Sequence, residues 1–202
     1  MTVARELRAM LPTWAIAVLL PIPMATFWNE GSGRAFAYCY LFLGTAILAA
    51  ERFRTNVAGE GSARDWQSKM TALALAEFGL CTIFTAFGWS MRDELAPEIP
   101  LFAVLAILPA LGCVPFATLR TGSPFTAILS IVILLASIKM LGCLVVRIAY
   151  GPTALADGEM MLPWEQPNFL VWFCLVNALA FSAIGYVLGR HAFVKPDRLS
   201  VG

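Results

Sequence analysis

The chain has 202 residues, of which 59% are hydrophobic and only 13% are charged, and its net charge is +1. Soluble domains carry about 25% charged residues, so this composition, with a mean hydropathy of +0.76, excludes an ordinary soluble domain and indicates an integral membrane protein. The near-zero net charge argues against a nucleic-acid partner. Because no polar block is long enough to fold by itself, we expect one membrane domain over residues 1–202.

Six apolar segments reach or approach the length of about 20 residues that a helix needs to cross a bilayer. They lack the two-residue alternation of barrel strands, and a lipid-exposed backbone must satisfy its own hydrogen bonds, which favours helices. The predicted fold is therefore an all-α integral membrane protein with six transmembrane helices. In chain order they cover residues 10–28, 35–50, 70–91, 101–119, 125–150 and 168–189.

The first apolar segment follows Arg5 and Arg8, as the core of a signal peptide does. It continues to Trp28 without a small-x-small cleavage site before a polar region. We therefore expect this segment to be retained as the first span.

The lysines and arginines predict the orientation, because they concentrate in cytoplasmic loops. If the N-terminus is cytoplasmic, only Arg34, Arg92 and Arg147 fall in outer segments. Most basic residues then lie inside: Arg5, Arg8, Arg52, Arg54, Arg64, Lys69, Arg120, Arg190, Lys195 and Arg198. With six spans, both termini are predicted to be cytoplasmic.

Three polar segments stand out between these spans. Residues 2–9, TVARELRA, are predicted to form a short interfacial helix before the first span. Residues 151–167 form the longest outer loop, and its apolar residues suit an element at the outer interface.

The third polar segment is the cytoplasmic loop 51–69, ERFRTNVAGEGSARDWQSK. Its centre, GEGS, cannot continue a buried helix, whereas residues 63–69 are able to form a short interfacial helix with Trp66 on the membrane side. Two interpretations remain open for this loop. It is either a docking place for a soluble partner or a solvated connector whose charges only fix the orientation of the chain.

The sequence contains no motif for chemistry of its own. It has no P-loop, no HExxH and no GxSxG, and its five cysteines show no spacing typical of metal ligands or disulfides. The single histidine, His191, is interpreted as a residue anchoring a helix at the membrane interface. We therefore expect no enzymatic activity, no catalytic residue, no cofactor and no bound metal.

Two ionisable residues lie inside predicted spans, where charge is costly and often functional. Glu77 is in the third span and Lys139 in the fifth, at depths that differ by about 10 Å at 1.5 Å per residue. They either line a translocation path or form a proton site, or they only lock helix packing. In the sixth span, Gly185 and Gly189 form a GxxxG motif, which we interpret as packing within the chain rather than a dimer seam.

Taken together, the arrangement resembles the permease subunits of ABC-2-type transporters. The similar stretches are AILAAERFRT at the end of the second span, RDWQSKMTALALA entering the third and RTGSPFTAILSIVILL entering the fifth. The resemblance implies six spans with both ends inside, an interfacial helix at 2–9, a coupling loop at 51–69 and an outer element at 151–167.

The resemblance also implies a function. The chain is expected to be a permease subunit in the plasma (inner) membrane of a bacterium, driven by a separate cytoplasmic ABC ATPase. A second copy or a related permease would complete the translocation path. Glu51 and Lys69 would anchor the ends of the coupling loop. The residues implied in contact with the ATPase are Arg54, Arg64, Asp65 and Trp66.

Two other classes of function remain open. The chain is alternatively a non-catalytic structural or accessory membrane subunit of a larger complex, with lipid-facing helices that hold other subunits. A stand-alone secondary transporter with Glu77 as proton carrier is the third, and the sequence shows neither the internal repeat nor the broken helices typical of that class.

Overall fold

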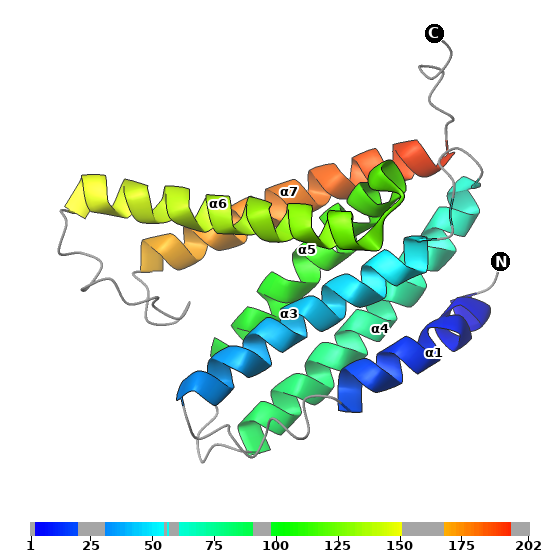
Figure 1. Ribbon diagram of the computed structural model, residues 1–202, viewed down its shortest axis with the longest axis horizontal. Helices are drawn as coiled ribbons and strands as arrows, with labels where there is room; N and C mark the ends of the chain where they lie inside the picture. Colours follow the sequence, from blue (N-terminus) through cyan, green and yellow to red (C-terminus); the bar gives the residue numbers. More distant parts are fainter. Residues whose placement is uncertain are drawn as a thin grey trace, which may run out of the picture.

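The computed structural model describes residues 3–19, 31–54, 56, 61–90, 98–150 and 168–194. All regular structure in these residues is α-helical, which confirms the predicted all-α class (Figure 1). The helices are α1 (Val3–Leu19), α3 (Gly31–Phe53), α4 (Ala63–Ser90), α5 (Glu98–Thr121), α6 (Pro124–Tyr150) and α7 (Asn168–Val194).

Four of these helices contain stretches long and apolar enough to cross a membrane. The stretches are Ala63–Phe87, Ala103–Thr121, Pro124–Ile148 and Trp172–Val194, and they coincide with the last four predicted spans. This is the pattern of a multi-pass membrane protein. α3 contains the predicted second span, and α1 contains the described part of the first, whose residues 20–28 lie outside the described ranges. The count of six spans therefore stays a prediction, and the outer loop 151–167 also lies outside the described residues.

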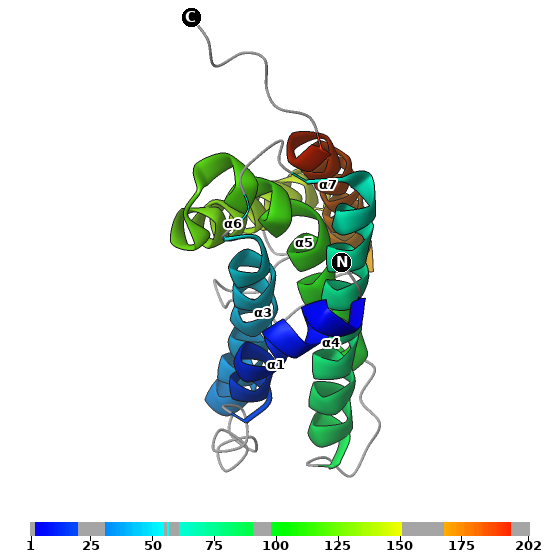
Figure 2. The same ribbon diagram turned by 90° about the vertical axis from the view of Figure 1, so that its right-hand side faces the viewer.

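The helices form two groups that meet around α5. α1, α3 and α4 run side by side, α6 and α7 run side by side at an angle to them, and α5 lies between (Figure 1). α5 packs on α3, α4, α6 and α7 and is the central helix. Seen with its start toward the viewer, α1 lies across α3 and α4 (Figure 2).

One end of the bundle collects most of the basic side chains, and we call it the basic end. Here α1 and α4 begin, α3 and α7 end, and α5 turns into α6 (Figure 1). Its described basic residues are Arg5, Arg8, Arg52, Arg54, Arg64, Lys69, Arg120, Arg190 and His191. The two described ends of the chain therefore lie on the same side of the bundle.

α1 is one continuous helix from Val3 to Leu19, and Pro12 lies inside it. The interfacial helix expected at residues 2–9 is thus the first part of α1 and does not end before the apolar segment begins. α1 buries Glu6, Met10 and Ala17 against the bundle. In addition, the indole Nε1 of Trp14 donates a hydrogen bond to the carbonyl oxygen of Ala76 in α4, at 2.9 Å.

The turn between α5 and α6 follows from two residues with special backbone properties. Gly122 has a positive φ of 65°, a conformation in which glycine commonly ends helices, and its N–H donates to the Thr118 carbonyl at 2.9 Å. Pro124 begins α6, where its missing N–H costs no helical hydrogen bond. Pro124 therefore lies in the first turn of the helix that contains the predicted fifth span.

α5 and α7 cross at very close range because glycines line their contact. A Cβ atom built on Gly185 would lie 2.9 Å from the Cα of Cys113 and from the backbone of Gly112. One built on Gly112 would overlap the backbone of Ser182. Gly189 of the same motif faces Phe116 and the ring of Trp66. The GxxxG motif thus packs α7 within the chain, as the sequence predicted.

The close crossing of α5 and α7 predicts that alanine substitution has different effects on stability at two glycines. We expect Gly112→Ala to lower the thermal unfolding midpoint of the detergent-solubilised protein, because the new methyl group forces the backbones of α5 and α7 apart at a cost of about 1–3 kcal/mol. The control is Gly79→Ala, whose Cβ would be 3.6 Å from the Trp14 ring. It should leave the midpoint unchanged or raise it, since alanine favours helix over glycine by up to about 1 kcal/mol. Equal midpoints for both variants would contradict the close crossing.

Candidate functional site

The loop between the second and third predicted spans is the candidate functional site. Its described part is the α3–α4 junction, residues 51–54, 56 and 61–69. The segment 63–69, expected as a short interfacial helix, forms the first two turns of α4 and continues without a break into the predicted third span. The charged residues of the junction are therefore attached directly to two long helices.

α4 begins at Ala63 because Ser62 and Asp65 form a capping box. The backbone N–H of Asp65 donates to the Ser62 hydroxyl at 3.1 Å, and that hydroxyl donates to Oδ2 of Asp65 at 2.7 Å. The backbone N–H of Ser62 points to the same carboxylate at 3.4 Å. These bonds satisfy amide groups that the first turn of a helix otherwise leaves unpaired. Asp65, predicted as a partner contact, has this structural role in the fold.

Trp66 is fully buried at the centre of an aromatic cluster. Its ring lies 5.3 Å from that of Phe53 in α3 and 5.5 and 5.7 Å from those of Phe193 and Tyr186 in α7, measured between centroids. Such tilted and edge-to-face pairs are favourable beyond the area that they bury. None of the Trp66 side chain is exposed, and its predicted contact with a partner protein stays a prediction.

The end of α7 is fixed to the junction by two further contacts. The N–H of Gly61 donates to the carbonyl oxygen of Phe193 at 3.2 Å. Gly189 allows Trp66 to approach α7, since a Cβ there would lie 2.9 Å from the indole ring. The start of α4 and the end of α7 are therefore packed against each other.

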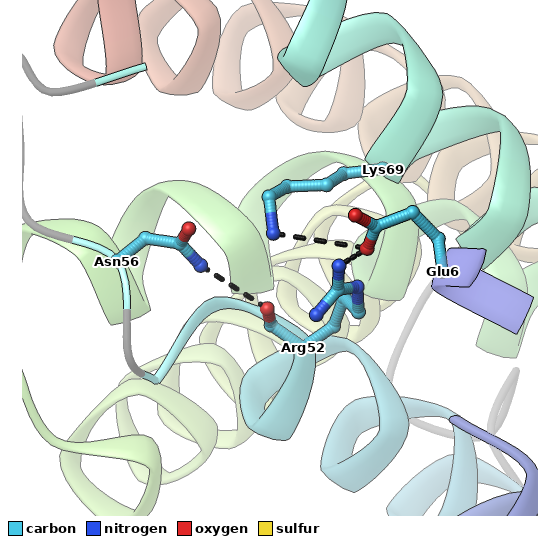
Figure 3. A network of polar contacts seen from close by, with 4 residues as sticks. All are labelled: Glu6, Arg52, Asn56 and Lys69. Carbon is cyan, nitrogen blue, oxygen red and sulfur yellow. Dashed lines mark hydrogen bonds and ion pairs between the residues drawn. The ribbon is translucent and has the colours of Figure 1, made fainter. Parts of the chain in front are cut away.

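On the side toward α1, the junction is held by a buried ionic cluster. Glu6 of α1 is only 1% exposed and forms ion pairs with Arg52 at the end of α3 and with Lys69 in the second turn of α4 (Figure 3). The Lys69 Nζ lies 3.8 Å from Oε2 of Glu6. Asn56 donates its side-chain N–H to the Arg52 carbonyl at 3.2 Å, which closes the end of α3.

Lys69, which the resemblance places at the end of the coupling loop, belongs to this cluster. Its side chain is 6% exposed, so it joins α4 to α1 inside the protein. Neither Glu6 nor Arg52 was predicted from the sequence as a residue of the site. The available signal was one acidic residue within the otherwise basic start of the chain, TVARELRA.

The remaining predicted contact residues form the exposed face of the junction. Glu51, Arg54 and Arg64 are exposed, and Glu51 in the last turn of α3 forms an ion pair at 3.3 Å with Arg54, which follows directly on that helix. Exposed pairs of this kind contribute little to stability. These three side chains therefore contribute little to the stability of the fold and are accessible to a partner.

The structure does not bring Glu77 and Lys139 together. Glu77 is fully buried on α4, and neither of its carboxylate oxygens has a hydrogen-bond partner among the described residues. Lys139 is half-buried on α6, close enough to Cys174 of α7 for an electrostatic interaction. A translocation path that uses both residues stays a prediction.

No family model, curated protein or solved structure matches this chain.

The aromatic cluster predicts how the junction responds to substitution. We expect Trp66→Ala to lower the thermal unfolding midpoint in detergent markedly, because truncating a buried tryptophan costs about 3–5 kcal/mol. Its neighbour Gln67 is exposed, so Gln67→Ala is the matched control and should change stability by no more than about 0.5 kcal/mol. A Trp66→Ala protein as stable as the control would contradict the assignment of Trp66 to the core.

Proposed function

We propose that the chain is the membrane-spanning permease subunit of an ABC-type transporter in the plasma (inner) membrane of a bacterium. A separate cytoplasmic ATPase would bind the basic end and drive the movement of an unidentified substrate. The observation that carries the proposal is the construction of the α3–α4 junction. It has an exposed charged face and a buried face fastened to α1 and α7.

Such a junction suits the transmission of force from a soluble partner. If a partner moved a flexible connector, the connector would deform and the attached helices would not move. Here Arg54 follows directly on α3, and Arg64 lies in the first turn of α4. A partner that binds these side chains differently in its two nucleotide states would favour one arrangement of the attached helices over the other.

The chemistry of the exposed face suggests the kind of surface that it would meet. Arg54 and Arg64 are exposed guanidinium groups, and Arg190 is exposed at the same end of the bundle. Guanidinium groups form paired hydrogen bonds with carboxylates. The contact surface of the ATPase would therefore be acidic, with Glu51 opposite a basic residue.

The transmembrane surface leaves room for a second permease copy or a related chain. α6 and α7 expose many large apolar side chains, among them Phe125, Met140, Ile148, Trp172 and Val187. Lipid or another permease would cover them. The same surfaces favour the second candidate function, an accessory subunit that holds other membrane proteins together.

Charge reversal at the junction tests the proposed function. We expect Arg54→Glu/Arg64→Glu to reduce the amount of ATPase that co-purifies from the native membrane in mild detergent by about tenfold or more, because the reversed charges repel an acidic partner surface. The control is Arg147→Glu, an exposed arginine at the far end of α6, which should retain the ATPase. Mass spectrometry would identify co-purifying proteins by their P-loop sequence.

Two results would contradict the proposal in different ways. Unchanged recovery of the ATPase with the double variant would remove Arg54 and Arg64 from the contact. Recovery of membrane proteins alone with the unmodified chain would reject the permease function and favour the accessory subunit.

A further inference from the structure

We infer that Glu6 is a positioning residue for the α3–α4 junction, because its one carboxylate balances two cations, one buried and one half-buried, that would otherwise drive the ends of α3 and α4 apart. The consequence for a partner rests on the proposed function. The charge balance itself does not, and it is tested separately below.

Two cationic side chains meet at the α3–α4 junction. Arg52 ends α3 and Lys69 lies in the second turn of α4, and they are close enough for their charges to repel. Both are shielded from water, with 14% and 6% of their side chains exposed. Like charges that are buried together interact far more strongly than they do in water. The packing of α3 against α4 at this point therefore requires an anion.

Glu6 supplies that anion from a third helix. Both cations pair with its carboxylate, and the residue is almost completely buried (Figure 3). Asp65 also attracts Lys69, but it lies on α4 itself and is engaged in the capping box with Ser62. Of these two acids, only Glu6 joins α3 and α4 across helices.

The charges of Glu6, Arg52 and Lys69 predict that the cluster tolerates the loss of one cation better than the loss of Glu6. When Lys69 is neutralised, Glu6 and Arg52 remain as a balanced pair. When Glu6 is neutralised, two cations remain without their shared partner, which is the costly way to break a buried ion pair. The loss of Glu6 should therefore be reversed by a second substitution that removes one of the cations.

The position of the exposed face depends on this balance. Arg54 lies two residues beyond Arg52, and Arg64 lies five residues before Lys69. If the ends of α3 and α4 separate, the two exposed guanidinium groups separate with them. Glu6 thus sets the geometry that a partner meets, although it is too deeply buried to touch that partner.

Trypsin cleavage after Arg54 and Arg64 in the detergent-solubilised full chain reports on local opening of the junction. We expect Glu6→Gln to raise the cleavage rate by about tenfold or more, since cleavage follows the population of the open form. Lys69→Met should stay within about threefold of the unmodified chain, because one balanced pair remains. The double variant Glu6→Gln/Lys69→Met should be cleaved at close to the rate of Lys69→Met alone. Glu6→Asp keeps the negative charge, so its cleavage rate should stay close to that of the unmodified chain.

The matched control is Met10→Ala, which loosens the packing of α1 one turn away without changing charge. Its cleavage rate should not fall when Lys69→Met is added. If the double variant Glu6→Gln/Lys69→Met is cleaved as fast as Glu6→Gln, Glu6 acts only by packing and the inference is wrong. If Glu6→Gln alone fails to fold, recovery of folded protein in the double variant supports the inference, and no recovery overturns it.

Co-purification of the ATPase with the same variants separates this inference from the proposed function. Loss of the ATPase with Glu6→Gln and its recovery with Glu6→Gln/Lys69→Met support both. A different result is that the variants show the expected cleavage rates but no ATPase co-purifies with the unmodified chain. This result supports the positioning role of Glu6 and rejects the proposed partner.

Discussion

The fold at the basic end depends on the placement of buried charge between three helices. The end of α3 and the start of α4 bring Arg52 and Lys69 together, and α1 places the carboxylate of Glu6 beside both of them. The opposite side of the same junction is held by aromatic packing of Trp66 against α7. Two different kinds of interaction thus fasten one short connection to helices from both groups of the bundle.

The packing of α5, α6 and α7 forms the rest of the bundle around the α3–α4 junction. α5 packs against four other helices, and its glycine-lined crossing with α7 leaves no space for a side chain at Gly112 or Gly185. α6 and α7 in turn expose large apolar side chains. The interior is therefore tightly packed around α5, whereas α6 and α7 expose large apolar surfaces.

Much of this fold follows from local sequence, and the contacts of the site do not. The apolar lengths predicted the helical class and six spans, four of which overlap helices long and apolar enough to cross a membrane, and Gly185 was placed correctly because close packing depends on residue type. Trp66 was assigned to the membrane surface because an indole suits both an interface and a core, and only the approach of α7 decides between them. Pairing of Glu6 with Lys69 depends on the crossing of α1 over α4, which no local pattern encodes.

The order of the three charges along the chain has a consequence for biogenesis. Glu6 is synthesised long before its partners, which become available only after α3 and the start of α4 have been made. Because N-terminal segments are made first, α1 is synthesised with an acid that has not yet met its cations. The ion pairs that hold α1 against the α3–α4 junction can therefore form only after the chain has been made as far as Lys69.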